Sequence, residues 1–306
     1  MNKLILGDNL EVLRTIPDES VDLIYLDPPF FSNRHYECIW QGDRNEIRSF
    51  EDRWSGGIEH YIGWLRERVQ EMHRVLKSTG SIYLHADHHA DAYIRVYILD
   101  PVFGSQNFRN EIVWHYTGGG RSPSSFSRKH DSIFWYSKSN SHTFNIDEIR
   151  VPYNPTSGYA KSGIKAKSGK TYMPNPLGTP VDDVWDIPII NPMASERIGY
   201  PTQKPEALLE RIIRASSNEG DIVLDPFVGG GTTVAVCNRL GRQWIGIDQS
   251  AQAIRVSENR INNQGLTTEF EVVLHKYDYE DLFTQDPFQR ENVINQGDSY
   301  LKRIGP

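Results

Sequence analysis

Cysteine and long apolar runs are scarce in this chain of 306 residues. Two cysteines in this length argue against a scaffold held together by disulfides. No apolar run is long enough to form a transmembrane helix. The start, Met1-Asn2-Lys3, leads directly into an apolar stretch without the pattern of a signal peptide. We therefore expect a soluble, cytoplasmic protein that has no membrane partner.

An overall excess of basic charge is also missing, because the formal net charge is −7. The charge is nevertheless segregated: residues 109–170 contain ten lysines and arginines against four acids, a local +6 that leaves −13 elsewhere. Within this stretch and just beyond it, residues 152–180 hold nine glycines and prolines in 29 positions, which is typical of an irregular insertion. Because clustered cations bind phosphates whatever the charge of the whole chain, we expect DNA contact here.

The cations of this region give the candidate DNA contacts. Three tyrosines are interleaved with the lysines, and aromatic and cationic groups together suit nucleic-acid surfaces. A solvated loop is the competing interpretation of the lysines, and a plain flexible turn that of the triple glycine before the arginine. The candidates are Arg121, Lys161, Lys165, Lys167 and Lys170.

The chemically most specific feature is Asp27-Pro28-Pro29-Phe30, which follows the apolar run 23–26. An exocyclic amine on a nucleobase is a poor nucleophile because its lone pair is delocalised into the ring. Asp27 and the carbonyl of Pro28 can accept its two N–H bonds and draw the nitrogen towards tetrahedral geometry, since consecutive prolines fix φ. Phe30 offers an aromatic face to a base taken out of the stack, and we expect Phe31 to extend it. The competing interpretation is an ordinary turn.

A strand, a glycine loop and a helix start form a second motif at residues 222–240. Its glycines let a ligand approach the backbone closely. The next strand, 243–248, ends in Asp248. In a Rossmann-like unit an acid about 20 residues beyond the glycine turn binds the ribose hydroxyls, so Asp248 is a candidate for this contact. The loop opens with the acid Asp225 and lacks the spaced Gly-x-Gly-x-x-Gly pattern, so it suits the positively charged S-adenosylmethionine better than the pyrophosphate of a nicotinamide cofactor.

With these two motifs the chain resembles the β group of DNA amino-methyltransferases, in which the catalytic tetrapeptide precedes the cofactor loop and a target-recognition region lies between them. The resemblance covers residues 1 to about 280. It implies a catalytic role for Asp27, Pro28, Pro29 and Phe30, with S-adenosylmethionine as cofactor and double-stranded DNA as partner. A homodimer and a cognate restriction endonuclease are further candidate partners.

The same resemblance implies the cofactor contacts. The segment 200–206 looks like the element that leads into the cofactor loop in that family, and the acid after the first strand of the chain looks like the one that contacts the adenine ring of the cofactor. The implied cofactor-binding residues are Asp8, Lys204, Pro205, Asp225, Phe227, Gly229, Gly231, Thr232 and Asp248.

The target base follows from the first residue of the tetrapeptide. In this family an aspartate there usually accompanies N6 of adenine and a serine usually accompanies N4 of cytosine, so we expect an adenine enzyme. Methylation at C5 of cytosine would need a cysteine nucleophile, and neither Cys38 nor Cys237 follows a proline in a catalytic loop. An N4-cytosine enzyme, an RNA or protein amine methyltransferase and a non-catalytic DNA-binding protein are the alternatives.

A cluster of histidines and acids at residues 85–91 invites a metal interpretation. Its spacing matches none of the usual zinc patterns, and its side chains would point in different directions if the preceding strand ended at Asp87. Methyl transfer from a sulfonium needs no Lewis acid. We therefore expect no metal here but a helix start. The family resemblance implies that this region flanks the target pocket, with His85 or Asp87 lining it.

The motifs together predict an α/β fold, with a doubly wound, Rossmann-like, mostly parallel sheet in the order of a circularly permuted methyltransferase. Because the strand before Asp8 begins the chain and the glycine-loop strand comes late, both must meet in one sheet. Apolar spacing from residue 62 predicts a helix ended by residues 78–80. The expected parts are 1–140 and 199–280 as catalytic and cofactor-binding halves, 141–198 as the inserted target-recognition region, and 281–306 as a tail.

Overall fold

A nine-stranded sheet organises the molecule. The computed structural model describes residues 2–31, 35–38, 47–51, 56–118 and 121–275. In these residues the strand order is β10-β6-β7-β5-β2-β11-β12-β1-β13. Strand β7 runs antiparallel to both of its neighbours, and the other neighbouring pairs are parallel. The predicted doubly wound, mostly parallel sheet is confirmed.

The strands of this sheet are β1 (Asn2–Leu6), β2 (Val21–Leu26), β5 (Leu76–Ala86), β6 (Phe108–His115), β7 (His130–Ser137), β10 (Val184–Asp186), β11 (Ile222–Asp225), β12 (Gln243–Asp248) and β13 (Phe270–Leu274). Two short antiparallel pairs lie outside it, β3 (His35–Cys38) with β4 (Ile47–Glu51) and β8 (Ile164–Lys165) with β9 (Thr171–Tyr172). The helices are α1 (Asn9–Leu13), α2 (Gly57–Val75), α3 (Asp91–Ile94), α4 (Asp100–Phe103), α5 (Gly158–Ser162), α6 (Glu206–Ser216), α7 (Thr232–Arg239) and α8 (Ala251–Asn262), with a π-helical turn at Arg95–Leu99 and 3-10 turns at Ser105–Asn107 and Ile146–Ile149.

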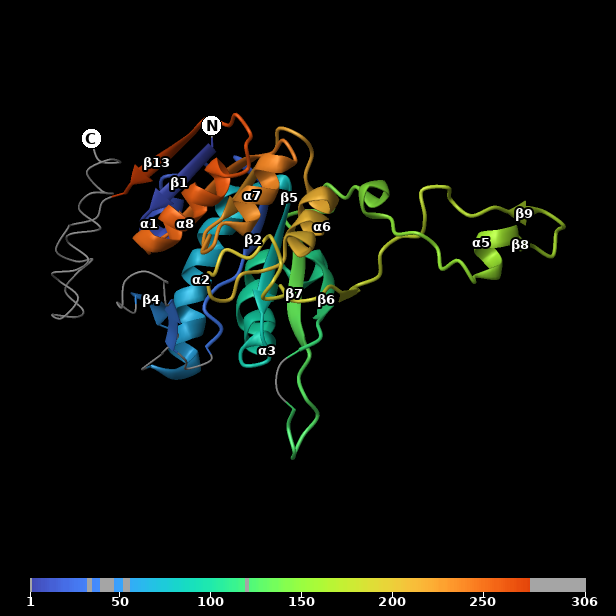
Figure 1. Ribbon diagram of the computed structural model, residues 1–306, viewed down its shortest axis with the longest axis horizontal. Coiled ribbons are helices and arrows are strands. Elements are labelled where there is room, and N and C mark those ends of the chain that lie inside the picture. Colours follow the sequence, from blue (N-terminus) through green and yellow to red (C-terminus); the bar gives the residue numbers. More distant parts are fainter. Residues whose placement is uncertain (1, 32–34, 39–46, 52–55, 119–120, 276–306) are drawn as a thin grey trace.

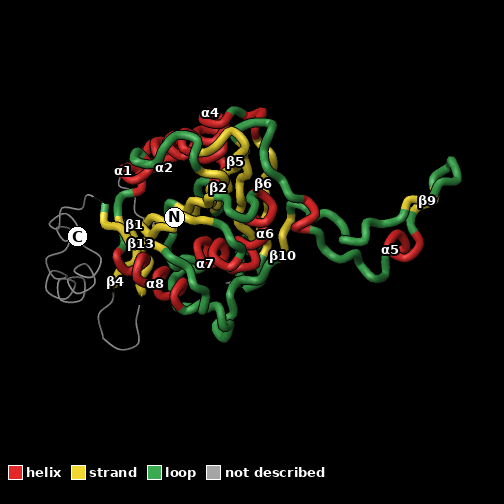
Figure 2. The backbone as a smooth tube through the Cα atoms, turned by 90° about the horizontal axis from the view of Figure 1, so that it is seen from above, coloured by secondary structure: helices red, strands yellow, loops and turns green. Residues whose placement is uncertain are grey.

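Helices cover both faces of the sheet. Figure 2 shows α1, α2 and α4 on one side and α6, α7 and α8 on the other. An apolar core lies on each face of the sheet, and alternate residues of β2 belong to each, because successive side chains of a strand point to opposite faces. Leu23 and Tyr25 pack with α6 and α7. Ile24 and Leu26 pack with α1 and α2. The strand is therefore apolar on both faces, as a buried parallel strand requires.

Strands from the first and the last parts of the described chain lie next to one another in this sheet. Strand β1 pairs in parallel with β12, with Leu6 opposite Asp248. Strand β11 pairs in parallel with β2, with Leu224 opposite Ile24. The carboxyl ends of β2, β11, β12 and β1 therefore lie side by side at one edge, and the loops that follow them share it. This arrangement confirms the permuted order predicted from the positions of the motifs.

The segment between β7 and α6 leaves the body as an arm that carries α5, β8 and β9 at its far end (Figure 1). The expected insertion at 141–198 is nevertheless joined to the sheet, because β10 returns to it and pairs with β6. Trp185 lies opposite Trp114 in this pair, and the indole of Trp114 donates to the carbonyl of Ile187 at 2.8 Å.

Helix α2 differs from its predicted end. It stops at Val75, and Leu76 already has extended dihedral angles and pairs with Val21. Residues 78–80 thus belong to β5, because burying Leu76 in the sheet outweighs the local turn signal. The expected tail 281–306 lies outside the described residues. Among the residues that are described, no helix is long and apolar enough to span a membrane.

Candidate active site

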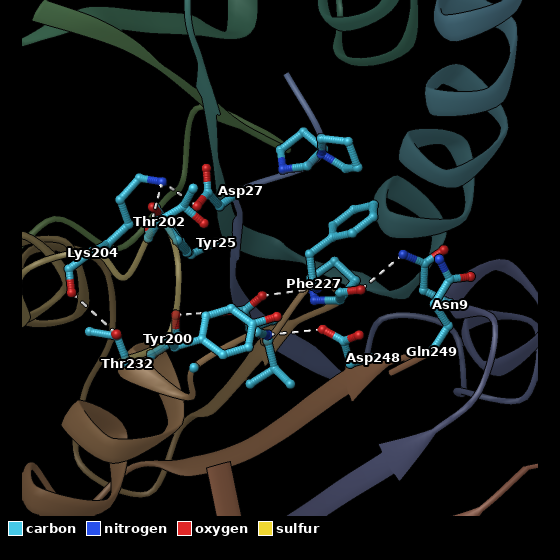
Figure 3. Close-up of a pocket in the computed structure, with 18 of the residues that line it drawn as sticks. Asn9, Tyr25, Asp27, Tyr200, Thr202, Lys204, Phe227, Thr232, Asp248 and Gln249 are labelled. Carbon is cyan, nitrogen blue, oxygen red and sulfur yellow. Dashed lines mark hydrogen bonds and ion pairs between the residues drawn. The ribbon is translucent and has the colours of Figure 1, made fainter. Parts of the chain in front are cut away.

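A pocket opens where the carboxyl ends of β2, β11, β12 and β1 meet (Figure 3). The loops after these strands and the segment 200–204 form its walls. Both sequence motifs, which are separated by about 200 residues, contribute to it. The predicted residues that line it are Asp8, Asp27, Pro28, Pro29, Phe30, Lys204, Asp225, Phe227, Gly229, Thr232 and Asp248; the predicted residues Pro205 and Gly231 lie behind this lining.

Asp27 and Lys204 form an ion pair in the catalytic wall, the part of the pocket lined by residues 27–30 and Lys204. The Nζ of Lys204 donates to Oδ2 of Asp27, and both side chains are largely buried. The second carboxylate oxygen, Oδ1, is buried and accepts no hydrogen bond from the described residues. A buried acceptor without a donor is costly, so a ligand that brought a donor to Oδ1 would be stabilised.

Phe30 stands beside this ion pair. The Nζ of Lys204 lies 5.0 Å from the centre of its ring, and the imidazole of His85 lies 5.5 Å from it on the sheet side. Phe31, expected to extend the aromatic face, instead packs on Tyr61 of α2 with ring centres 5.6 Å apart and does not line the pocket. That expectation is wrong because the ring of Phe31 packs against the apolar core beside α2.

His85 is fully buried beneath the catalytic wall and does not line the pocket, contrary to one of our expectations. Its Nδ1 bonds the hydroxyl of Tyr25 at 3.1 Å, and its Nε2 bonds Oδ2 of Asp131 at 3.2 Å. The hydroxyl of Tyr116 donates to the other oxygen of Asp131 at 3.1 Å. Burial alone would raise the pKa of Asp131, but the bond and charge of His85, the charge of Lys204 and the bond from Tyr116 together lower it. This chain of bonds supports Phe30 from behind.

The cofactor loop needs glycine at two positions for different reasons. Gly229 has φ +48°, and a Cβ there would lie 3.2 Å from the ring of Tyr200. Gly231 has φ +72°, and a Cβ there would lie 2.6 Å from Oγ of Ser257. Both positions therefore combine a left-handed backbone with close packing. The sequence did not single out Tyr200 as a residue of this wall.

Two acids flank this loop, the buried Asp225 and the partly buried Asp248. Asp225 accepts from Oγ1 of Thr233 at 2.5 Å and from the amide of Phe227 at 3.0 Å. Asp248 accepts from the amides of Gly229 and Ser250 at 3.0 and 2.9 Å. Burial raises the pKa of Asp225 to about 7 and that of Asp248 to about 6, although these bonds oppose the shifts. A cationic ligand would favour the charged form of both carboxylates.

An Arg68-centred network forms the opposite wall, and sequence reasoning missed it. Arg68 bonds Oδ2 of Asp8 at 2.8 Å and Oδ1 of Asn9 at 2.7 Å, and its guanidinium lies 4.2 Å from the ring of Trp64. Asn9 in turn donates to the carbonyl of Pro226 at 2.9 Å. Helix α2 is thereby tied to the cofactor loop. An arginine and a tryptophan four residues apart on the buried face of a helix were the available signal.

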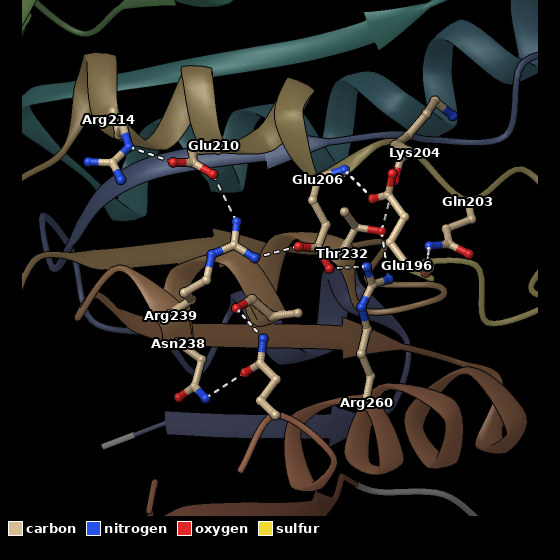
Figure 4. A network of polar contacts seen from close by, with 12 residues as sticks. Glu196, Gln203, Lys204, Glu206, Glu210, Arg214, Thr232, Asn238, Arg239 and Arg260 are labelled. Carbon is tan, nitrogen blue, oxygen red and sulfur yellow. Dashed lines mark hydrogen bonds and ion pairs between the residues drawn. The ribbon is translucent and has the colours of Figure 1, made fainter. Parts of the chain in front are cut away.

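A second network of polar contacts, centred on Arg260, holds the cofactor loop in place (Figure 4). Arg260 of α8 donates to the carbonyl of Gly230 at 3.1 Å and to Oγ1 of Thr232 at 3.0 Å. Its other nitrogen bonds Glu206 at 2.7 Å. Burial alone would raise the pKa of Glu206, but Arg260 and Arg239 lower it. Thr232 also donates to the carbonyl of Lys204 at 3.2 Å. This bond joins the cofactor loop to Lys204, the residue that forms the ion pair with Asp27.

A family model described as DNA methylase matches residues 21–259, most of the chain and all of the motifs above except the strand before Asp8. The chain belongs to the DNA methylase family. The type II methyltransferase M.HpaI of Haemophilus parainfluenzae is 35% identical over 86% of this chain and 74% of that protein. The DNA adenine methyltransferase YhdJ of Escherichia coli (strain K12) is 34% identical over 85% of this chain and 82% of that protein.

The DNA methylase fold is also present in TTHA0409 of Thermus thermophilus, solved in complex with S-adenosyl-L-methionine. It aligns with a TM-score of 0.60 and 21% identity over 90% of this chain and 100% of that one, a likeness that concerns the fold alone. The chain is thus a DNA methyltransferase. Its pocket fits S-adenosylmethionine, because the acids Asp225 and Asp248 line it and this cofactor carries positive charge and no phosphate.

The candidate DNA contacts of this methyltransferase lie apart from the pocket. The four lysines are exposed near the far end of the arm, where Nζ of Lys170 lies 5.2 Å from the centre of the Tyr172 ring. Between Glu148 and Asp182 the arm contains no acid. Arg121 is exposed on the loop between β6 and β7.

The histidine cluster of the methyltransferase is more compact than expected. Candidate ligand atoms of Asp87, His88 and His89 lie within 4.8 Å of one another, so the expectation that these side chains diverge is wrong. The reason is a tight turn after Ala86, in which Nδ1 of His89 bonds Oδ2 of Asp87 at 2.6 Å. Asp87 does not line the pocket. The helix start expected here is present, because α3 begins at Asp91.

Proposed function

We propose that this methyltransferase methylates N6 of an adenine that has rotated out of duplex DNA. The observation that carries the proposal is the state of Asp27: one oxygen is held by Lys204, and the other is buried at the pocket wall with no donor among the described residues. An exocyclic amine supplies that donor. An aspartate at position 27 favours adenine over cytosine, and the relative YhdJ, a DNA adenine methyltransferase, supports the same base.

The residues of the pocket have different roles in the proposed reaction. Asp27 and the carbonyl of Pro28 accept the two N–H bonds of the amine and orient its lone pair, while Phe30 stacks on the adenine ring. S-adenosylmethionine supplies an electrophilic methyl group, whose bond to sulfur breaks as the bond to nitrogen forms. Asp27 is placed to take the proton that the amine loses. Holding the two reactants in line can lower the barrier by about 7–11 kcal/mol at most.

The other predicted residues take roles around this centre. Asp248 is proposed to hold the ribose, and Asp8 the adenine ring of the cofactor. The lysines of the arm and Arg121 are proposed to contact phosphates and position the duplex. A homodimer, a cognate restriction endonuclease and a cytoplasmic location stay predictions.

Analysis of methylated DNA tests the proposal. Chromosomal DNA from a host that expresses the protein is digested to nucleosides and analysed by mass, and the same DNA is sequenced with detection of modified bases. We expect N6-methyl-2′-deoxyadenosine as the new nucleoside, confined to one sequence context and reduced with Asp27→Asn. N4-methyl-2′-deoxycytidine would support the cytosine alternative, which uses the same geometry, and preferential methylation of RNA over duplex DNA in direct competition would reject DNA as the substrate.

A further inference from the structure

The loop between β6 and β7 projects from the edge of the sheet that holds the active site. Strand β6 runs antiparallel to β7, and β7 antiparallel to β5, so β6 points in the same direction as β5 and β2. Its carboxyl end therefore lies at the edge from which Asp27 emerges. The amide of Tyr116 donates to the carbonyl of Lys129 at 2.9 Å and closes the neck of the loop. Figure 1 shows the loop extending beyond the sheet as a hairpin near α3.

Serines shape the tip of this loop and leave Phe126 outside it. Oγ of Ser122 bonds Oγ of Ser125 at 2.8 Å and accepts from the amide of Ser125 at 3.2 Å. The hydroxyl of Ser127 accepts from the amide of Ser122 at 3.2 Å. Phe126 is 100% exposed, the most exposed of the described large apolar side chains. A whole phenyl ring in water is unfavourable, so a partner that takes it up would stabilise it.

The charge around Phe126 indicates the partner. Arg121 and Arg128 are exposed on either side of it along the loop. Between Glu111 and Asp131 the chain has no acid and three cations. An apolar ring between arginines matches a partner with an apolar interior and anionic borders, and duplex DNA has stacked bases between two phosphate backbones.

We propose that Phe126 is a wedge that enters the base stack beside the target adenine and fills the space which the flipped base leaves, with Arg121 and Arg128 on the flanking phosphates. The inference rests on the proposed methylation of a flipped adenine and deepens it by assigning the residue that opens the duplex. Phe30 cannot serve both purposes, because it lies in the wall of the pocket that receives the base. Apolar wedges of this kind unstack base steps in other DNA-binding proteins.

The test separates opening of the duplex from methyl transfer. Its variants are Phe126→Ala, which removes the wedge, and Phe126→Leu, which keeps an apolar one. Leu266→Ala is the matched control, because Leu266 is also an exposed apolar residue but lies on the loop before β13, at the opposite edge of the sheet. The probes are a short duplex with the sequence that the parent methylates and the same duplex with an abasic site opposite the target. An unpaired target is easier to extrude.

Initial rates of methyl incorporation are measured on both duplexes. On the paired duplex we expect Phe126→Ala to be slower than the parent by roughly ten- to a hundredfold, the range that loss of one aromatic–base stack gives. On the abasic duplex the same variant should return to within a few-fold of the parent. Phe126→Leu should lie between the two, and Leu266→Ala should match the parent on both probes.

Two results would overturn the wedge. An unchanged rate of Phe126→Ala on the paired duplex would show that the ring plays no part in methylation. An equal loss on both duplexes would place Phe126 against the flipped base itself, not in the stack. Failure of the proposed function looks different, because the parent protein would then methylate no adenine in duplex DNA, and no sequence for the two probes could be found.

Discussion

Lys204 and Asp27 are 177 residues apart in the sequence and form an ion pair in the wall of the pocket. Asp27 follows β2, and Lys204 precedes α6. The pair occupies only Oδ2 of the carboxylate, and Oδ1 remains buried and without a donor among the described residues. The lysine thus fixes the orientation of the carboxylate and leaves one acceptor for the substrate.

Asp27→Asn should slow methyl transfer while leaving the cofactor pocket formed. The amide has the same shape, but one of its two positions becomes a donor and the charge is lost. Loss of a charge-assisted hydrogen bond costs about 1.5–3 kcal/mol, so the rate should fall roughly ten- to a hundredfold. Methyl incorporation into DNA measures the rate, and calorimetric titration should give nearly unchanged affinity for S-adenosylmethionine. Asp18→Asn, at an exposed acid far from the pocket, is the control; turnover near that of the control would reject the role of Asp27.

Asp225 should make the stability of the free protein depend on pH. Burial raises its pKa to about 7, above that of the unfolded chain, so the folded state holds this proton to higher pH. The contribution is fully present near pH 4 and is lost as the pH rises through about 7. Relative to Asp225→Asn, the free energy of unfolding of the parent should therefore fall by up to a few kcal/mol between about pH 4 and pH 8.

Urea denaturation of the parent and Asp225→Asn across this pH range measures the difference. Saturating S-adenosylmethionine should reduce it, because a cationic ligand favours the charged carboxylate. A difference that is constant from pH 4 to pH 8 would contradict the assigned pKa direction.

Asp248→Ala should weaken the binding of S-adenosylmethionine. The carboxylate would lose charge-assisted bonds to ribose hydroxyls, each worth about 1.5–3 kcal/mol, so the affinity should drop by roughly one to two decades. Because Asp248 also accepts from the amides of Gly229 and Ser250, a thermal melt without cofactor is needed to show that the variant folds. Calorimetric titration gives the affinity. Equal affinities in the folded variant and the parent would mean that the ribose lies elsewhere.

Replacing Lys161, Lys165, Lys167 and Lys170 by alanine should weaken binding to every DNA sequence alike, because phosphate contacts position the protein without reading bases. Each lost contact should flatten the plot of log affinity against log salt by about 0.9 units. Binding of a target duplex and a scrambled duplex is measured at several salt concentrations. Lys3→Ala, at the opposite edge of the sheet, is the control. An unchanged slope would mean that the lysines belong to a solvated loop without phosphate contacts. A loss of affinity confined to the target duplex would mean that the arm contacts bases.

Contiguous patterns determined much of this protein. The tetrapeptide at 27–30, the glycine loop after Asp225 and the acid Asp248 each combine a strand end with chemically specific residues, and all three lie where such motifs were predicted, at carboxyl ends of parallel strands. The order of the motifs along the chain was enough to predict that its ends meet in one sheet. Sequence could do this because apolar runs, prolines and glycines act on the backbone over a few residues.

Tertiary structure alone decided which groups face one another. The pairing of Asp27 with Lys204, the burial of His85 between Tyr25 and Asp131, and the return of β10 to the sheet join residues that are distant in the sequence. Such contacts depend on which faces of helices and strands pack together and on how each buried polar group finds a partner. Local patterns do not contain that information, because the sequence around a lysine or a histidine does not show whether its side chain is exposed to solvent or buried in the core.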